Sequence, residues 1–342
     1  MIDKRDDKIK FGCYVYQQGL EYKDIQRIVI ECERLGFDSV WLKDNFTSSW
    51  LNAYFSYNKK SDNIRKSRES FPILESWTTL CSLATITTKI RLGAILVNLY
   101  RSPSITAKMV STLDVIAGGR IEFGLSAGWY EEECKSYGIP FPKASTRVEM
   151  LEESLVIIKK MLTEKHASSF DGKYYTISEA DCNPKPIQKP HPPLWIGGGG
   201  KKTLQLVAKY ADGWNYGLCT YDEYLSKIAI LRDCCNMIGK KYENLVKALH
   251  MVIRVVETDN ELESSKTKIH NENIISDSGG DGSNVWNKNP DLVISGTANN
   301  IKREINRYKN IGVNYFTIHF PDLPDLRSLD LFARYVVPEF KT

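Results

Sequence analysis

The sequence predicts an α/β fold, a (β/α)8 barrel of the TIM type with insertions, and three observations lead to it. Short apolar runs typical of strands alternate with amphipathic helical segments about eight times between residues 9 and 336. Residues 90–99 (IRLGAILVNL) are apolar almost throughout, as in a parallel strand covered on both faces. The chain has 342 residues, 42% of them hydrophobic, which suits one large domain over residues 1–342. A doubly wound open sheet is the alternative fold.

The first half of the chain contains four predicted strands, at residues 9–16, 37–42, 90–99 and 120–125. Helical periodicity separates them at residues 25–35, 72–87 and 104–116, and a longer helix is predicted at residues 146–162. Gly36 and the pair Gly118-Gly119 end two of these helices. Residues 47–70 are rich in Asn, Ser, Lys and Tyr and exceed a normal connection in length, so we expect an insertion that covers a site.

The second half begins with a predicted hairpin at residues 169–177, which turns at Asp171-Gly172. Four more strands are expected at residues 194–196, 212–216, 246–257 and 313–319. Helices are expected from Thr203, at residues 221–239, at residues 297–312 with Thr297 as cap, and at residues 325–336. The polar residues 259–290 are interpreted as a second insertion, a flexible loop that acts as a lid.

Four consecutive glycines, Gly197, Gly198, Gly199 and Gly200, stand between a predicted strand and a predicted helix. Without Cβ atoms the backbone can approach a ligand closely, and the helix N-terminus beyond it favours an anion such as phosphate. This pattern is neither of two common phosphate loops. Trp195 occupies the position of the first glycine of a Walker A motif, and Lys202 occupies the third glycine position of a dinucleotide-binding motif. A flexible solvated loop is the alternative interpretation.

The composition of the chain indicates which classes of binding partner to expect. The net charge of +4 is mild and no basic stripe interleaves with aromatic residues, so nucleic acid is not an expected partner. The eight cysteines show no metal-ligand spacing, and we interpret them as reduced thiols of a cytoplasmic protein. No signal-peptide core and no run of eighteen apolar residues occurs, so no membrane association is expected. A small molecule is the predicted partner.

In such a barrel the chemistry gathers where strands end at their carboxyl side. The predicted strand ends contain polar or glycine-rich residues at 16–17, 44–45, 98–101, 126–130, 197–200, 214–217 and 319–322. The functional site is therefore expected among these segments.

Several of these segments carry a resemblance to a known family. The stretches are GFDSVWLKDN (36–45), RSPSITAKMVSTLDVIAGGRIEFGLSAGWYEEE (101–133), YGIPFP (137–142), CNPKPIQKPHPPLWIGGGG (182–200) and YADGWN (210–215). Together they resemble the luciferase-like superfamily of flavin- and deazaflavin-dependent oxidoreductases, and most closely its coenzyme F420-dependent branch. The resemblance covers nearly the whole chain and implies a (β/α)8 barrel, commonly in a homodimer.

The resemblance also implies roles for individual residues. It places the cofactor ring over the third and fourth strands, with the phosphate at Gly197 to Gly200, and the polar edge of the ring near Asp44. It further implies a non-proline cis peptide behind the ring, which by position is the Ile95–Leu96 bond. The residues expected along the ring are Ile95, Leu96, Asn98, Ala127, Gly128 and Trp129.

The chain departs from the family pattern at two positions. Many F420-dependent relatives have Asp-His where Asp44-Asn45 stands here, and sugar-phosphate-oxidising relatives have Glu at the position of Trp129. Asn cannot act as a general acid or base, so an alcohol-dehydrogenase-like reaction with those two groups is not expected. The catalytic candidates are Asn45, Trp129, as a ring-stacking or pocket residue, and His319, as a proton-transfer group or a strand-end cap.

Other polar residues receive less specific interpretations. Arg101 is expected to contact an anion or to form a salt bridge within its loop. His250 is interpreted as structural because it lies inside a strand. The run Glu131-Glu132-Glu133 is interpreted as an acidic first helical turn and not as a metal site.

Three functions stay open at this point. The first is hydride transfer between bound coenzyme F420 and an unidentified small organic substrate. The second is an FMN-dependent monooxygenase that uses reduced flavin and oxygen at the same site. The third is a barrel that binds a flavin or a partner without catalysis.

Overall fold

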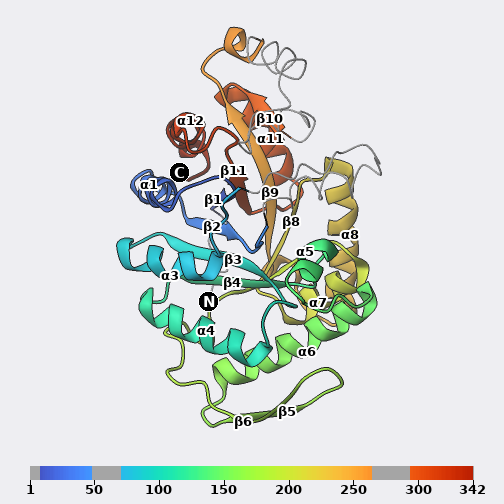
Figure 1. Ribbon diagram of the computed structural model, residues 1–342. Helices are drawn as coiled ribbons and strands as arrows, with labels where there is room; N and C mark the ends of the chain where they lie inside the picture. The colour runs from blue at the N-terminus through green and yellow to red at the C-terminus, as the bar shows by residue number, and fades with distance from the viewer. Residues whose placement is uncertain (1–7, 48–70, 264–292, 342) are drawn as a thin grey trace.

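Eight parallel strands close into a barrel in the computed structural model, which describes residues 8–47, 71–263 and 293–341 (Figure 1). Each strand pairs in parallel with its neighbours, and the last pairs with the first, with Lys10 opposite Tyr315. The predicted (β/α)8 barrel is confirmed, and the alternative open sheet is wrong. In barrel order the strands are β1 (Lys10–Val15), β2 (Ser39–Lys43), β3 (Arg91–Val97), β4 (Ile121–Ser126), β7 (Leu194–Gly197), β8 (Gly213–Gly217), β9 (Val246–Val255) and β11 (Tyr315–His319).

Helices surround the barrel, most of them within a few residues of their predicted bounds (Figure 1). One starts later than expected. α3 begins at Ser76 and not near Pro72, because the Glu75 carboxylate accepts hydrogen bonds from the amides of Trp77 and Thr78 as an N-cap. The helices are α1 (Tyr22–Arg34), α3 (Ser76–Ile86), α4 (Pro103–Ile116), α5 (Glu131–Ser136), α6 (Ala144–Thr163), α7 (Lys201–Tyr210), α8 (Tyr221–Met237), α11 (Ala298–Lys309), α12 (Arg327–Tyr335) and α13 (Pro338–Lys341), with a short 3-10 turn at Tyr242–Asn244.

Two features lie outside the barrel. The predicted hairpin is present as β5 (Ser168–Asp171) and β6 (Thr176–Ala180), which lie beyond α6 in Figure 1. β10 (Val293–Gly296) was not predicted. It pairs in parallel with the second half of β9, which is longer than the other barrel strands and extends past them.

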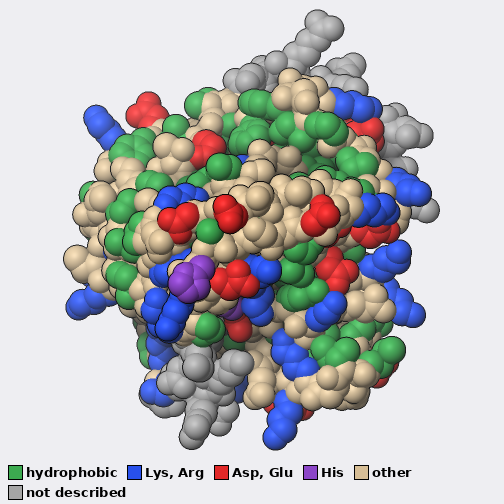
Figure 2. All heavy atoms as spheres, turned by 90° about the horizontal axis from the view of Figure 1, so that it is seen from below, with side chains coloured by type: hydrophobic (Ala, Val, Ile, Leu, Met, Phe, Trp, Pro, Cys, Tyr) green, Lys and Arg blue, Asp and Glu red, His purple; other side chains and the backbone are tan. Residues whose placement is uncertain are grey.

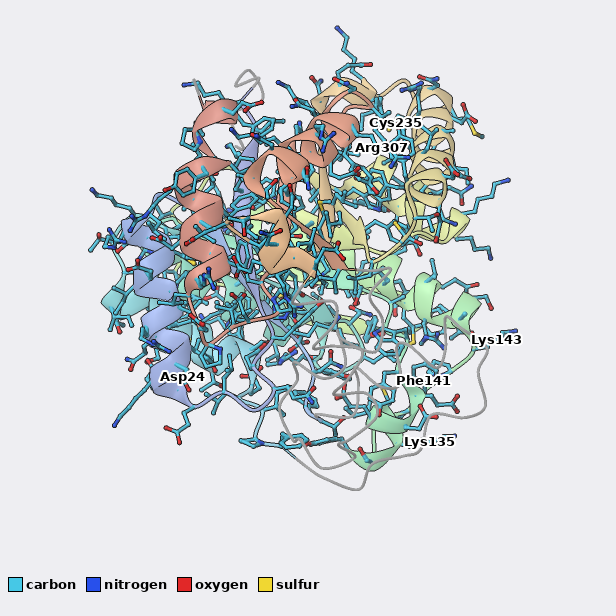
Figure 3. The ribbon with its side chains drawn as sticks, turned by 90° about the horizontal axis from the view of Figure 1, so that it is seen from above. Asp24, Lys135, Phe141, Lys143, Cys235 and Arg307 are labelled. Carbon is cyan, nitrogen blue, oxygen red and sulfur yellow. The ribbon has the colours of Figure 1, made fainter. Side chains whose placement is uncertain are left out.

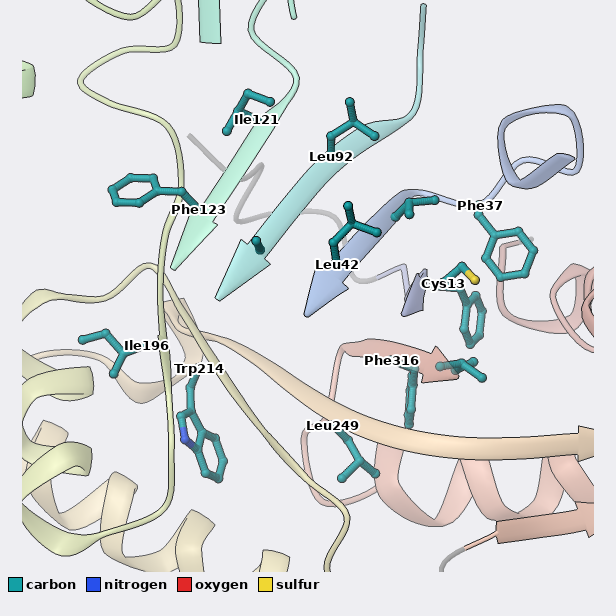
Figure 4. Close-up of a cluster of buried hydrophobic side chains, with 14 of the residues drawn as sticks. Cys13, Phe37, Leu42, Leu92, Ile121, Phe123, Ile196, Trp214, Leu249 and Phe316 are labelled. Carbon is teal, nitrogen blue, oxygen red and sulfur yellow. The ribbon is translucent and has the colours of Figure 1, made fainter. Parts of the chain in front are cut away.

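The larger part of the core lies between the strands and the helices. Figure 4 shows side chains of this layer, among them Leu92, Phe123 and Leu249, each at most 2% exposed. Because side chains alternate along a strand, these residues share one face of the sheet and the residues between them point into the barrel.

The interior of the barrel is filled by aromatic rings. Trp41 and Trp195 meet edge to face with ring centroids 5.3 Å apart, and the centroid of Tyr315 lies 5.2 Å from that of Trp195. Gly93 makes room for them, since a Cβ atom there would lie 2.7 Å from the Trp41 ring. A ligand therefore cannot enter the interior, and the barrel mouth at the carboxyl ends of the strands is the place for a site.

Charged side chains of both signs lie on the surface of the described residues (Figure 2). In the face shown in Figure 2, acidic and basic side chains are interspersed. No helix in the described part of the chain combines the length and the hydrophobicity needed to cross a bilayer. All eight cysteines lie in described residues, and each is a free thiol.

Candidate active site

The floor of the barrel mouth is built from side chains that point inward at the strand ends. Strand alternation and register place these residues at a similar level. β3, β4, β7 and β8 contribute small or neutral residues, whereas β1, β2, β9 and β11 contribute aromatic and basic ones. The inward-facing residues are Tyr14, Tyr16, Lys43, Ile95, Val97, Ser126, Gly197, Asn215, His250, Thr317 and His319.

The four glycines form a tight corner at the end of β7. Gly198 has a φ of +123°, which side-chain-bearing residues rarely adopt. A Cβ on Gly197 would lie 2.9 Å from Ile95 Cγ2, and one on Gly199 would lie 2.6 Å from the Tyr216 ring. The Gly198 carbonyl accepts a hydrogen bond from Trp214 Nε1 (2.8 Å), which fixes the path of the turn. The corner therefore requires glycine for steric and conformational reasons.

The corner opens onto the N-terminus of α7. Gly200 is the N-cap residue and no side chain caps the helix, so the amides of the first turn still have capacity for a ligand. The positive end of the helix dipole favours an anion at that position. Lys201 and Lys202 in the first turn are exposed. These features fit a phosphate group.

The residues of strand β3 that were expected along the ring lie on opposite faces of the sheet. Ile95 packs against the interior cluster, whereas Leu96 is 1% exposed within the layer between strands and helices. Asn98 is also buried, and its Nδ2 lies 3.5 Å from the hydroxyl of Tyr175 on the outer hairpin. Leu96 and Asn98 thus direct their side chains away from the barrel interior, and only their backbone can contribute to the mouth.

The expectation of a cis Ile95–Leu96 peptide is wrong. Among the described residues the cis bonds are X-Pro bonds only, preceding Pro184, Pro190 and Pro324. Residues 92–97 keep regular parallel pairing with β4 through Leu96 opposite Leu125, so the strand runs extended through that bond.

The segment after β4 curves over the same half of the mouth. Gly128 has a φ of +80°, and a Cβ there would lie 3.2 Å from Val97. Ala127 is half-buried beside it. Trp129 is half-buried, stacks on Tyr130 with centroids 5.2 Å apart, and packs against the interior cluster. Trp129 is therefore placed at the mouth with a flat face for packing.

Asp44, which directly follows β2, is held by an ion pair. Arg101 donates to both of its carboxylate oxygens (3.0 and 3.1 Å), and the Val97 amide and the Ser76 hydroxyl also donate to it. Arg101 forms salt bridges as one interpretation expected, but with Asp44 after β2 and Glu75 before α3 and not within its own loop. Both Asp44 carboxylate oxygens, which were expected to contact the polar edge of the ring, instead accept hydrogen bonds from the protein. These bonds connect the loops after β2 and β3.

Asn45 is oriented by Glu133, a residue whose role the sequence did not reveal. Asn45 Nδ2 donates to Glu133 Oε2 (2.8 Å), and the amides of Phe46 and Thr47 and the hydroxyls of Thr47 and Tyr100 also donate to that carboxylate. Because Nδ2 is committed, Asn45 Oδ1 is left as an acceptor, and it is buried without a hydrogen-bond partner among the residues that the structure describes. A donor on a ligand would satisfy this oxygen.

Helix α5, which carries Glu133, is anchored by its connection to α6. Figure 3 shows Lys135 and Phe141 in this region. The Arg147 guanidinium lies 3.9 Å from the centre of the Phe141 ring, a cation–π contact. The first turn of α5 is acidic as predicted, but Glu133 is buried while Glu131 and Glu132 are exposed. Among the described residues no group of three His, Cys, Asp or Glu is arranged to hold a metal ion.

His250 lies inside β9 as expected, and its side chain points into the barrel near the mouth, where hydrogen bonds hold it, in agreement with its interpretation as structural. Its Nε2 lies 2.6 Å from the Tyr16 hydroxyl and its Nδ1 lies 2.9 Å from the Thr317 carbonyl. A carbonyl only accepts, so Nδ1 carries the proton and Nε2 accepts from Tyr16.

His319 Nδ1 donates to the Tyr14 carbonyl (3.1 Å) in the same way. Burial lowers the pKa of both histidines to about 3, and Lys43 contributes to the shift of His250. Both imidazoles are therefore neutral.

Sequence reasoning placed Tyr16 at a strand end but missed its contact with His250, and it missed Lys43 and Glu133 as site groups. Period-two alternation in residues 246–252 would have placed His250 on the inward face, but the long apolar run hides where the barrel rim lies along β9. Trp50 and Trp286, which belong to the two predicted insertions, lie outside the described residues.

Comparison with known proteins finds a matching family model and several proteins of similar sequence or fold. A family model for luciferase-like monooxygenases matches residues 8–271. The FMNH2-dependent dimethylsulfone monooxygenase of Pseudomonas putida is 30% identical over 138 residues, 40% of this chain and 38% of that protein. Pyrimidine monooxygenase RutA of Agrobacterium fabrum is 34% identical over 149 residues, 43% of this chain and 39% of that protein. These matches span less than half the length of either relative. An F420-dependent secondary alcohol dehydrogenase, solved with an F420–acetone adduct, has a TM-score of 0.77 at 21% identity and covers 98% of this chain and 100% of that one, a likeness of fold.

Proposed function

The chain belongs to the luciferase-like monooxygenase family, and from this premise we propose that it is an oxidoreductase that binds coenzyme F420 at the barrel mouth and transfers a hydride between the deazaflavin and a small organic substrate. The observation that carries the proposal is the uncapped N-terminus of α7 behind the glycine corner. It supplies backbone donors and a positive dipole end for the phosphate of the cofactor side chain.

The residues of the glycine-rich half fit a planar ring. Ile95 and Val97 form an apolar floor, the backbones of Gly197 and Gly128 pack closely against these two side chains, and Trp129 offers an aromatic face. When bound, a deazaflavin or flavin ring supplies the electron chemistry. The protein contributes placement of the ring and the substrate, and it excludes water from the contact between them.

The polar groups of the mouth determine what proton chemistry is available. Asp44 is neutralised by Arg101, and Asn45 has no titratable proton. The neutral His250 holds the Tyr16 hydroxyl, and the neutral His319 is bound to the Tyr14 carbonyl. We therefore propose that Asn45 positions a ligand through Oδ1, that Trp129 shapes the pocket, and that His319 supports the aromatic wall.

A second candidate is an FMN-dependent monooxygenase that uses reduced flavin and oxygen. Its support is the identity of 30% and 34% to two monooxygenases, one of them named as FMNH2-dependent. The same phosphate corner and ring-binding half would serve FMN, because both cofactors carry a tricyclic ring and a phosphate-bearing side chain.

Titration of the purified protein with F420 and with FMN separately, followed by quenching of cofactor fluorescence, tests the proposal. We expect F420 to bind. Binding of FMN with none of F420 would replace the first candidate with the second, and binding of neither would remove both. A bound cofactor that is never reduced or oxidised with any substrate candidate would indicate a barrel without catalysis.

A further inference from the structure

Three buried side-chain oxygens in the loops of the barrel mouth have no hydrogen-bond partner among the described residues. They are Gln18 Oε1, Asn45 Oδ1 and Asp322 Oδ1. They belong to the loops that follow β1, β2 and β11, and these strands are neighbours in the order β11-β1-β2 (Figure 1). An amide or carboxylate oxygen accepts hydrogen bonds. We call these three residues the acceptor side of the mouth.

Hydrogen bonds connect the three loops at their bases. His319, the last residue of β11, donates from Nδ1 to the Tyr14 carbonyl on β1 (3.1 Å). The side chain of Gln17, next to Gln18, accepts from the Lys43 amide and donates to the Lys43 carbonyl at the end of β2 (2.9 Å each). The strand with the glycine corner, β7, is four strands from β1 in either direction around the barrel. The acceptor side therefore lies across the mouth from the glycine corner.

The orientation of Asn45 Oδ1 is fixed by its neighbour. Asn45 Nδ2 donates to Glu133 Oε2 (2.8 Å), and a carboxylate only accepts, so a reversed amide would set two acceptors against each other. Asn45 is 2% exposed and Glu133 is 1% exposed. An acceptor kept from water in this way is stabilised when a ligand supplies a donor.

Asp322 is held in a comparable way. Its Oδ2 accepts from the Ser328 amide at the start of α12 (2.9 Å), which leaves Oδ1 as the second acceptor. The Ser328 hydroxyl accepts from the Val255 amide at the end of β9 (3.2 Å), and Asp322 acts electrostatically on Arg254 of the same strand. The carboxylate is thus placed beside the part of β9 that extends past the other strands.

Several donors near these loops are bonded within the protein. The Tyr16 hydroxyl donates to His250 Nε2 (2.6 Å). His250 Nδ1 donates to the Thr317 carbonyl, and His319 Nδ1 is also bonded to a carbonyl. The buried capacity for hydrogen bonding that remains on the acceptor side is therefore that of acceptors.

We infer that the substrate presents an O–H or N–H group to the acceptor side, and that this side selects such substrates over compounds whose polar groups only accept. The inference rests on the proposed function, since the cofactor must occupy the half of the mouth near the glycine corner. A site built from acceptors rejects an analogue without the donor, because its oxygens then stay unpaired.

Titration of the cofactor-loaded protein at neutral pH with four benzene derivatives of similar size tests the inference, with the absorbance of the cofactor ring as readout. Phenol carries an O–H donor and aniline an N–H donor, acetophenone only accepts, and toluene does neither. We expect phenol, aniline or both to bind about 3- to 10-fold more tightly than toluene and acetophenone, the size of one neutral hydrogen bond. Phenol against aniline distinguishes a hydroxyl from an amine.

Glu133→Gln should reverse the Asn45 amide. The amides of Phe46 and Thr47 donate to Oε1 and keep an oxygen there, so the new amide nitrogen takes the place of Oε2 and donates to Asn45. Asn45 then offers Nδ2 to the ligand. Aniline binding should weaken about 3- to 10-fold and acetophenone binding should tighten by a similar factor, with cofactor affinity changed by less than about 2-fold. Glu132→Gln, at an exposed position in the same helix, is the matched control and should keep the wild-type order.

Asp322→Asn gives an independent readout, which is decisive where Glu133→Gln does not unfold cooperatively in urea. The Ser328 amide only donates, so it retains the oxygen of the new amide, and the nitrogen replaces Oδ1. Binding of phenol and aniline should weaken relative to that of acetophenone.

The inference is overturned by a cofactor-loaded wild type that binds none of the four probes, or that binds toluene or acetophenone as tightly as phenol and aniline. Folded Glu133→Gln and Asp322→Asn variants that both keep the wild-type order would also overturn it. A loss of cofactor affinity in Glu133→Gln without a change of probe order would assign Asn45 Oδ1 to the cofactor instead. Failure of the proposed function looks different, because the initial titration then shows that neither F420 nor FMN binds.

Discussion

Replacement of Gly200 by aspartate tests phosphate binding at the glycine corner without lowering the stability of the fold. Gly200 is the N-cap of α7 with φ −68° and ψ 143°, a backbone conformation open to any residue. A Cβ there would have Thr203 Oγ1 at 3.6 Å as its nearest neighbour, so the side chain fits. Gly198, at φ +123°, would strain any substitution and confuse the two effects.

An aspartate at the N-cap accepts hydrogen bonds from the first-turn amides that we assign to the phosphate. The fold should therefore keep its free energy of unfolding or gain a few tenths of a kcal/mol. The cofactor loses these donors and meets a like charge, which at about 4 Å costs on the order of 4 kcal/mol at an effective dielectric constant of about 20. We expect the Kd for the cofactor to rise by at least about 100-fold.

Fluorescence titration measures the Kd, and urea unfolding measures the stability of the same samples. Gly200→Asn is the matched control, because it caps the helix with the same shape and no charge and should weaken binding by about 10-fold. A stable Gly200→Asp variant that binds the cofactor as tightly as the wild type would refute the assignment of the phosphate to this corner.

Three further predictions concern stability. Both His250 and His319 have a pKa near 3 in the fold and about 6.5 when unfolded. The unfolded state therefore takes up protons first as the pH falls below about 6.5, and the unfolding free energy should drop by about 1.4 kcal/mol per pH unit for each histidine. Replacement of both by Gln should flatten this slope in a pH series of urea titrations; an unchanged slope would contradict the neutral assignment. Gly93→Ala should lower the melting temperature by overpacking Trp41, at a cost of about 1–3 kcal/mol, and an unaltered melting temperature would show that the interior has room to adjust. Lys43→Met should raise the unfolding free energy by about 1–3 kcal/mol at neutral pH, because it removes a desolvated ammonium. This gain should shrink between about pH 8 and 10.5, because the folded wild type releases the Lys43 proton near pH 8 while the unfolded state keeps it until about pH 10.5. A gain independent of pH would point to packing instead.

Local patterns were sufficient to predict the barrel and the glycine corner. The alternation of short apolar runs with helical periodicity depends on neighbouring residues only, and the corner is four consecutive glycines between a strand and a helix. Helix starts were predicted less well where a side chain decides them, as Glu75 does for α3.

The polar part of the site depends on contacts between distant segments and could not be predicted. Glu133 lies in a run of three glutamates that is typical of an exposed helical turn, yet it binds residues 45–47 and Tyr100. Tyr16 and His250 are 234 positions apart, and only the closure of the barrel brings them to 2.6 Å. Whether Arg101 binds a ligand or Asp44 was likewise decided by the packing of the loops after β2 and β3.

A crystal structure of the protein with F420 or FMN bound tests the central assignment most directly. We predict that the cofactor phosphate lies within hydrogen-bond distance of the backbone amides at Gly199 to Thr203, with the ring above Ile95 and Val97. A phosphate bound elsewhere on the barrel, with those amides facing solvent, would contradict the account.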